Sequence, residues 1–292
     1  MSTETIPRRR PAGIEPLVVM HDVGKSYGNV HALRGVNLEV YPGEVTCVLG
    51  DNGAGKSTLI KIMAGLHEHT SGSFEVNGVK RNLASPRAAQ ALGIATVYQD
   101  LALAPLMSVW RNFFMGNEIR KAPFLDARRM KSIADEELQK MGIQIGDLDR
   151  PVGGLSGGQK QCIAIARAIY FGAKGIILDE PTAALGVKQS GVVLKYIAKA
   201  RDAGLGVVFI THNPHHAYLV GNHFIILKLG RLTLDAPRDA LTLDQLTAEM
   251  AGGQELAELK HELGDVDPGK VVDPDNPEIE LAGPGKPRVQ EG

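Results

Sequence analysis

A short glycine-rich segment constrains the fold more than any other part of the chain. Residues 50–58 have the sequence GDNGAGKST, which matches the pattern G-x-x-x-x-G-K-[ST] and follows the strand-like run 44–49. Glycines at this spacing let consecutive backbone N–H groups turn around phosphate oxygens, and the helix that begins at the lysine adds its partial positive charge. A glycine-rich turn with a chance lysine is disfavoured, because a strand precedes and a helix follows. The segment therefore predicts a nucleoside triphosphate site.

Two side chains of this loop have predicted roles beyond those of its backbone. Lys56 is expected to reach the β- and γ-phosphates, and the Ser57 hydroxyl is expected to coordinate Mg²⁺. The whole loop is expected to contact the nucleotide, through Gly50, Asp51, Asn52, Gly53, Ala54, Gly55, Lys56, Ser57 and Thr58.

An acidic pair, Asp179 and Glu180, directly follows the apolar run 175–178 and precedes Pro181. Taken alone, the pair favours an ordinary helix start, because acidic groups stabilise the positive end of a helix and proline suits its first turn. The phosphate loop upstream changes this interpretation. Asp179 is predicted to anchor the Mg²⁺ shell, and Glu180 is predicted to polarise the attacking water as a general base.

Segments with strand and helix character alternate along the chain. Strand-like runs come first, at residues 17–23, 36–40 and 44–49, and helical patterns dominate between about 101 and 172. From residue 175 to 229 strands and helices alternate again. This order predicts a parallel sheet covered by helices, with a helical insertion in its middle.

Residues 155–159 have the sequence LSGGQ, and the apolar helix pattern QCIAIARAIY follows at 161–170. A flexible Ser-Gly-Gly linker is disfavoured because the helix follows at once. With the phosphate loop before it and ILDEP after it, LSGGQ makes residues 16–235 resemble the nucleotide-binding subunit of ATP-binding-cassette (ABC) transporters. The resemblance implies an α/β P-loop NTPase fold: a mostly parallel sheet core, an N-terminal antiparallel β subdomain and an inserted helical subdomain.

The same resemblance implies that ATP and Mg²⁺ are bound and that two copies of the chain pack head to tail as a homodimer. Each ATP would then lie between the phosphate loop of one copy and the LSGGQ segment of the other. The helix start would meet the γ-phosphate across the interface. The residues concerned are Ser156, Gly157, Gly158 and Gln159.

Three further positions match functional residues of that family. Tyr27, in KSYG, matches the aromatic that stacks on adenine, although it could be a half-buried strand tyrosine. Gln99, in VYQD, matches the glutamine that touches metal and water, with a surface residue as the alternative. His212, in FITHN, matches the histidine near the γ-phosphate. A metal site with His215 and His216 is disfavoured, because no cysteine or acid nearby completes a ligand set. The resemblance thus implies catalytic roles for Glu180, His212, Lys56 and Gln99, and metal contacts from Ser57, Gln99 and Asp179.

The chain departs from the family at Gly186. Many members carry an aspartate there that communicates across the dimer, and no replacement for it is evident in the sequence. The run PTAALGV (181–187), together with residues 101–118, resembles importers of monosaccharides of the ribose, xylose and fructose type, in their single-cassette form. The resemblance implies an ATPase subunit on the cytoplasmic face of the membrane. Its implied partners are two membrane permease subunits and, indirectly, a periplasmic or extracellular sugar-binding protein.

Other functions remain open at this point. An ABC ATPase for another solute fits the same motifs. A non-transport ABC protein of translation or DNA repair is disfavoured, because the chain shows neither heptads nor a basic face. A non-hydrolysing regulatory subunit is disfavoured by the intact Lys56, Asp179, Glu180 and His212.

The composition adds three limits. A net charge of −1 gives no reason to expect a nucleic-acid partner, and the longest apolar runs fall far short of the ~18 residues that span a bilayer. Cys47 and Cys162 lie in apolar patterns and are expected to be reduced and buried. Along the chain we expect a flexible N-terminus (1–15), an ABC ATPase domain (16–252) and a disordered, acidic, proline-rich tail (253–292).

Overall fold

The computed structural model describes residues 4–5, 13–251, 271–272 and 280–281. The chain divides into two units, residues 1–250 and 251–292. In the second unit, the strands β14 (Val271–Val272) and β15 (Glu280–Leu281) pair in antiparallel orientation. The flexible N-terminus and the disordered tail lie mostly outside the described residues, so both remain predictions.

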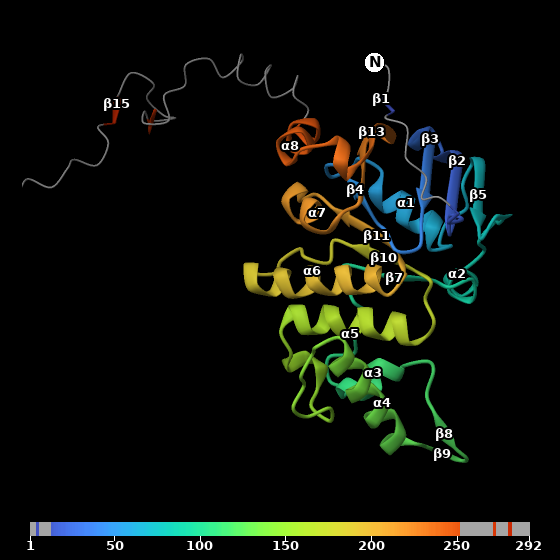
Figure 1. The fold of residues 1–292 in the computed structure, drawn as a ribbon, viewed down its shortest axis with the longest axis vertical. Coiled ribbons are helices and arrows are strands. Elements are labelled where there is room, and N and C mark those ends of the chain that lie inside the picture. The colour runs from blue at the N-terminus through green and yellow to red at the C-terminus, as the bar shows by residue number, and fades with distance from the viewer. Residues whose placement is uncertain (1–3, 6–12, 252–270, 273–279, 282–292) are drawn as a thin grey trace, which may run out of the picture. The chain divides into compact units, whose positions relative to one another are not determined.

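Seven strands form the main sheet of the first unit, in the order β1-β13-β12-β4-β11-β10-β7 (Figure 1). Neighbouring strands are parallel except β12 and β13, which are antiparallel. The predicted mostly parallel core is therefore confirmed. The strands are β1 (Glu4–Thr5), β4 (Val45–Leu49), β7 (Ile94–Val97), β10 (Gly175–Asp179), β11 (Gly206–Thr211), β12 (His223–Lys228) and β13 (Arg231–Pro237).

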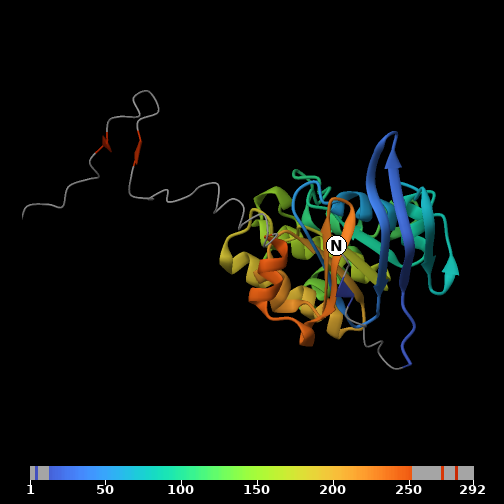
Figure 2. The same ribbon diagram turned by 90° about the horizontal axis from the view of Figure 1, so that it is seen from above.

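Helices connect these strands and cover the sheet (Figures 1 and 2). The helices are α1 (Lys56–Met63), α2 (Pro86–Ala91), α3 (Val109–Phe114), α4 (Ala127–Lys140), α5 (Gly157–Tyr170), α6 (Val187–Asp202), α7 (Pro214–Val220) and α8 (Leu243–Met250), with short 3-10 turns at Val152–Gly154 and Arg238–Ala240. Within the described residues, no helix is both long enough and apolar enough to cross a bilayer.

The inner strands are mostly apolar because both faces of the sheet are covered. Every residue of β4 and β11 is buried. Successive residues of a strand point to opposite faces, so Cys47 joins the core that contains Cys162 of α5, while Val48 joins the core that contains Ile60 of α1. Both cysteines are free and buried, as expected, and burial raises the pKa of both thiols above its ordinary value.

An antiparallel sheet packs over the face that carries α1. Its strands follow the order β3-β2-β5-β6, and its apolar residues share one core with that face of the main sheet. The predicted N-terminal antiparallel subdomain is therefore present. Its strands are β2 (Val18–Tyr27), β3 (Val30–Val40), β5 (Ser71–Val76) and β6 (Val79–Lys80).

The inserted region between β7 and β10 contains α3, α4 and α5, as the helical patterns predict. It also contains a hairpin that the sequence reasoning missed, formed by β8 (Arg120–Lys121) and β9 (Phe124–Leu125). An aromatic cluster joins α3 to the end of α5, with ring centroids of Phe113 and Phe114 within 6.3 Å of those of Tyr170 and Phe171.

Candidate nucleotide site

The candidate site lies at the carboxyl edge of four neighbouring parallel strands, β4, β11, β10 and β7. The register pairs Leu49 with Thr211 and Ile210 with Asp179, so these strands end side by side. Ligands of open α/β sheets bind at this edge, where the loops that leave the strands converge. The loops here carry the phosphate loop 50–58, the pair Asp179 and Glu180, His212, and Gln99.

The backbone of the phosphate loop requires glycine at particular positions. Gly50 has φ 143°, and a Cβ there would lie 2.3 Å from the carbonyl oxygen of Leu227. Gly55 has φ 109°, and its Cβ would lie 2.8 Å from the carbonyl oxygen of Ala32. Gly55 is also the residue before α1, so it offers no side chain to the first N–H groups of that helix. Those amides suit a phosphate group, which accepts hydrogen bonds and carries negative charge.

The Lys56 side chain curls back over the loop and is 8% exposed. Its ammonium donates hydrogen bonds to the carbonyl oxygens of Gly50 at 2.5 Å and of Asp51 at 2.9 Å. Burial lowers the pKa of Lys56, while the charges of Glu180, Asp51 and Asp179 act in the opposite direction. The ammonium thus lies at the mouth of the loop between backbone oxygens and carboxylates, where an anion can replace the carbonyl contacts.

The carboxylate of Glu180 is fixed by two side chains from the end of β11. His212 Nδ1 lies 2.8 Å from Glu180 Oε1, and the Thr211 hydroxyl donates a hydrogen bond to Glu180 Oε2 at 3.2 Å. The Glu180 side chain is 14% exposed and that of His212 is 60% exposed. The structure therefore places Glu180 against His212, although the two are 32 residues apart in the chain.

Asp179 and Ser57 are the residues that can hold a divalent cation. Burial raises the pKa of Asp179, and the charge of Glu180 raises it further, while Lys56 lowers it. A carboxylate in such a place gains when a cation approaches it. Ser57 is exposed in the first turn of α1. A hydroxyl and a carboxylate are oxygen ligands of the kind that Mg²⁺ accepts, so the residues fit this ion.

The antiparallel sheet reaches the phosphate loop through the turn between β12 and β13. Gly230 N donates to Ala54 O at 2.9 Å, and Arg34 N of β3 donates to Gly230 O at 2.8 Å. At the end of the neighbouring strand β2, Tyr27 is 41% exposed, and its ring meets that of His67 edge to face at 5.6 Å. This exposure leaves the phenol able to stack on a base.

Gln99 is exposed directly after β7, at the far end of the same sheet edge. Its place is compatible with the predicted metal contact. The predicted roles of Tyr27 and Gln99 stay predictions.

The LSGGQ segment does not lie in a loop of this edge; it forms the start of α5, in the inserted region. Ser156 Oγ accepts a hydrogen bond from Gln159 N at 3.2 Å, and Gln159 Oε1 accepts one from Ser156 N at 3.0 Å, which is a capping box. Ser156 is exposed. A Cβ on Gly157 would lie 2.6 Å from Leu185 Cδ2, so the segment that follows Glu180 packs against this helix start.

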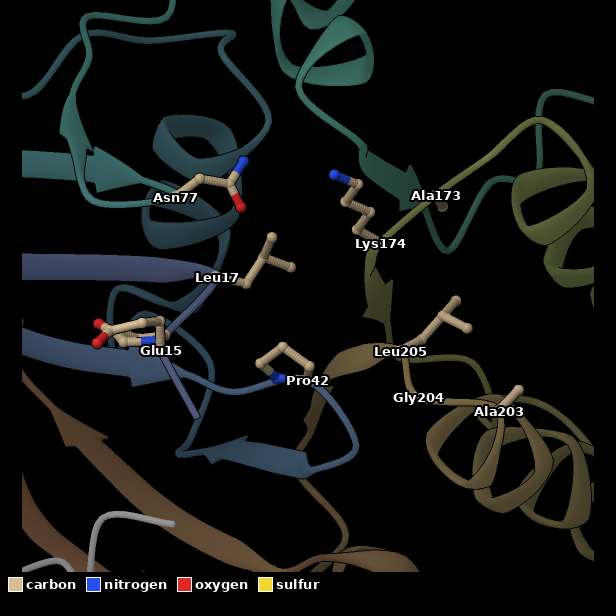
Figure 3. Close-up of a pocket in the computed structure, with 10 residues that line it drawn as sticks. Glu15, Leu17, Pro42, Asn77, Ala173, Lys174, Ala203, Gly204 and Leu205 are labelled. Atoms are coloured by element: carbon tan, nitrogen blue, oxygen red, sulfur yellow. The ribbon is translucent and has the colours of Figure 1, made fainter. Parts of the chain in front are cut away.

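A cavity of about 430 Å³ lies at the opposite edge of the sheet (Figure 3). Pro42, Lys174 and Leu205 in its lining precede β4, β10 and β11, so it is at the amino ends of these strands. Its other lining residues include Glu15 and Asn77. The cavity is therefore separate from the candidate nucleotide site, and none of the sequence-predicted site residues lines it.

Sequence reasoning gave no role beside the Glu180 segment to four polar residues, Thr182, Thr211, Asn213 and His216. The pattern Asn213-Pro214 does signal a helix start, since asparagine caps helices and proline suits their first position. Asn213 does cap α7 by accepting a hydrogen bond from His216 N at 3.1 Å. The contacts of the other side chains depend on strand register and leave no local pattern.

Comparisons with known proteins agree with this geometry. A family model described as ABC transporter matches residues 33–183. The xylose/arabinose import ATP-binding protein of Sulfolobus acidocaldarius is 42% identical, over 80% of this chain and 93% of its own length. The fructose import ATP-binding protein of Rhizobium meliloti is also 42% identical, over 82% of this chain and 96% of its own length.

Among solved structures, an ATP-binding cassette captured as a dimer with ADP and Pi has a TM-score of 0.65 and 28% identity, covering 76% of this chain and 98% of its own. Its likeness agrees with the P-loop α/β fold. The family model and the two relatives, matched over nearly their full lengths, establish that this chain belongs to the ABC transporter family.

Proposed function

We propose that this chain is the ATP-hydrolysing subunit of a transporter that imports a monosaccharide. The observation that carries the proposal is the convergence at one sheet edge of an anion-binding loop with Lys56, the carboxylate Asp179, and Glu180 held against His212. Phosphoryl transfer depends mainly on positioning and on charge stabilisation, and this edge supplies both.

Each group at the edge has a distinct task. The phosphate-loop amides and Lys56 bind and orient the triphosphate. Ser57, Asp179 and Gln99 hold Mg²⁺, which when bound neutralises charge on the phosphate oxygens. Glu180 accepts a proton from the attacking water, and Thr211 and His212 keep its carboxylate in one orientation. Tyr27 stacks on the adenine ring.

The LSGGQ helix start completes the site from a second copy of the chain. Ser156 is exposed and belongs to a helix start that is already stable through its own capping box. The N–H groups and the dipole at an exposed helix N-terminus favour binding of an anion. A cassette of the same fold has been captured as a dimer. Two ATP molecules would therefore close a head-to-tail homodimer.

The transport part of the proposal comes from the relatives. One is named for import of xylose and arabinose and another for import of fructose, at equal identity to this chain. This supports a monosaccharide as the solute class. The chain would act at the cytoplasmic face of the membrane, bound to two permease subunits, and a sugar-binding protein would deliver the solute from outside. Dimer closure would push on the permeases through the region near residues 99–116.

The substitution Glu180→Gln tests the hydrolytic mechanism, because it removes the base and keeps the size of the side chain. Phosphate release should fall by about 100-fold or more, while an ATP-bound dimer accumulates in gel filtration. Glu136→Gln, at an exposed position of α4, is the control and should behave as the wild type. Wild-type phosphate release from Glu180→Gln would refute the base assignment.

The solute class is tested separately, by uptake in the host cell. Disruption of the gene should abolish uptake of one or more labelled sugars among xylose, arabinose, fructose and ribose. The wild-type gene should restore uptake, and the Glu180→Gln variant should not. Normal uptake of all four sugars after disruption, with active ATP hydrolysis by the purified chain, would leave an ABC ATPase for another solute as the better assignment.

A further inference from the structure

A closed set of hydrogen bonds lies behind Glu180. The Thr211 hydroxyl donates to Glu180 and accepts from Asn213 N at 3.1 Å, and Asn213 Oδ1 accepts from His216 N at 3.1 Å. His216 Nδ1 lies 3.0 Å from the Thr182 hydroxyl. Because Thr182 is two residues beyond Glu180, the set returns to the segment where it began.

The segment that carries Glu180 needs such support. Glu180 has φ 46° and Ala184 has φ 58°. Residues other than glycine rarely adopt this left-handed backbone conformation, and the surrounding structure must stabilise it. The backbone gives part of this support, since Glu180 N donates to Ile210 O at 2.9 Å. From side chains, the support includes the contact between His216 and Thr182.

Because Thr182 is buried, loss of its contact with His216 would leave its hydroxyl without a partner. Thr182 is 6% exposed and Thr211 is 1% exposed, so water cannot readily replace a lost partner. Burial lowers the pKa of His216, and the neighbouring charges of His215 and His212 lower it further. The imidazole is therefore neutral at pH 7, with one ring nitrogen able to donate and the other able to accept.

We propose that His216 is a positioning residue for Glu180: by holding Thr182 it fixes the segment 180–186 against α7, so that the carboxylate keeps its contacts with Thr211 and His212. The inference rests on the proposed role of Glu180 as general base. His216 would act on the chemical step and not on ATP binding, because the phosphate loop lies on β4 and α1, outside this hydrogen-bonded set.

The test compares ATP hydrolysis by the full-length chain and four single variants. His216→Ala should lower kcat about tenfold, as expected for loss of one well-placed contact, and should change the KM for ATP by less than about twofold. His216→Asn should recover most of kcat, because its amide occupies the place of the ring Nδ1. His216→Gln places its amide beyond that position and should not. His215→Ala, at the exposed neighbour, should match the wild type.

Several results would overturn the inference. Unchanged kcat in His216→Ala would do so directly. If the Asn and Gln variants lose kcat to the same extent, and both also lose melting temperature, His216 only stabilises the fold. If His216→Ala does not fold, the comparison of Asn with Gln decides. Absent hydrolysis by the wild type, or wild-type hydrolysis by Glu180→Gln, would instead count against the proposed function.

Discussion

The phosphate loop and the LSGGQ segment each lead into a helix, but the two helices are capped differently at their N-termini. Helix α1 follows Gly55, which has no side chain to offer its first amides. Helix α5 follows Ser156, whose hydroxyl and backbone amide are both engaged with Gln159. The first helix start thus has no side-chain cap and leaves its amides open to a ligand, whereas the second is capped by its own side chains.

Charge separates the two regions in the same way. The sheet edge around the phosphate loop gathers Lys56, Asp179, Glu180 and His212, while residues 155–159 carry no charged side chain. Under the proposed function, the first region would bind the nucleotide by itself. The second can add only neutral hydrogen bonds and the helix dipole, which act at short range. Under the proposed function, nucleotide binding would then need one chain and hydrolysis would need two.

The most direct test of this difference is to mutate the phosphate loop in one copy of the chain and the LSGGQ segment in the other. Lys56→Ala removes the ammonium, and Ser156→Asp keeps a capping side chain but adds a negative charge that would face the phosphates. Each variant alone should lose about 100-fold or more of its hydrolysis rate, as for loss of a key group that stabilises the transition state. Only the Ser156→Asp variant should retain binding of a fluorescent ATP analogue as a monomer.

Mixing the two variants should restore activity. In a head-to-tail dimer of one copy of each, one of the two sites combines an intact phosphate loop with an intact LSGGQ segment. Random pairing puts half of the dimers in this form, so the mixture should reach about a quarter of the wild-type rate. A mixture no more active than the average of its components would show that the two regions are not shared between copies.

A smaller effect is expected from removal of the cap alone. Ser156→Ala should destabilise the chain by about 1 kcal/mol, the usual loss for a serine cap, as measured by urea unfolding. It should also lower hydrolysis about tenfold, because the lost hydroxyl would face a charged phosphate.

The matched control is Ser85→Ala at the start of α2, where the serine hydroxyl also accepts a hydrogen bond from a backbone amide. It should cost similar stability with unchanged hydrolysis. Equal hydrolysis by the two variants would mean that Ser156 is only a cap.

The sequence predicted those parts of the site whose chemistry is set by local spacing. The phosphate loop, the pair Asp179 and Glu180, and the LSGGQ helix start can each be recognised from fewer than ten consecutive residues. The supporting residues could not be found this way, because Thr211 and His216 reach Glu180 and Thr182 across 31 and 34 residues of chain. Only the register of β10 and β11 brings them together.

The fold shows the same division between local and long-range information. The buried strands β4 and β11 are mostly apolar, so their patterns were clear. Strand β3 was predicted only over residues 36–40. Its first half is largely exposed, and its pairing with β2 extends it to Val30. The β8–β9 hairpin, with two residues in each strand, was too short to give a periodic signal.

A third helix start, that of α6, follows Leu185, which packs against the LSGGQ helix start, and it offers a third case for the comparison. Gly186 precedes α6, and the first residue of the helix, Val187, is 90% exposed and is followed by Lys188, a basic residue at the positive end. Gly186 has φ −67° and ψ 160°, and a Cβ there would meet nothing within 4 Å. An aspartate therefore fits without strain and could cap the helix.

Gly186→Asp should accordingly raise the free energy of unfolding by a few tenths of a kcal/mol, about the difference between glycine and aspartate as a cap together with a weak dipole contribution. Urea unfolding at low and high salt measures both parts, since salt screens the dipole interaction and leaves the hydrogen bond. Gly191→Asp, in the second turn of α6, is the control that adds the same charge where no cap can form. If both variants gain equally, the gain comes from replacing glycine in general. If Gly186→Asp loses stability, the start of α6 is held by contacts other than its cap, as the packing of Leu185 on Gly157 would provide.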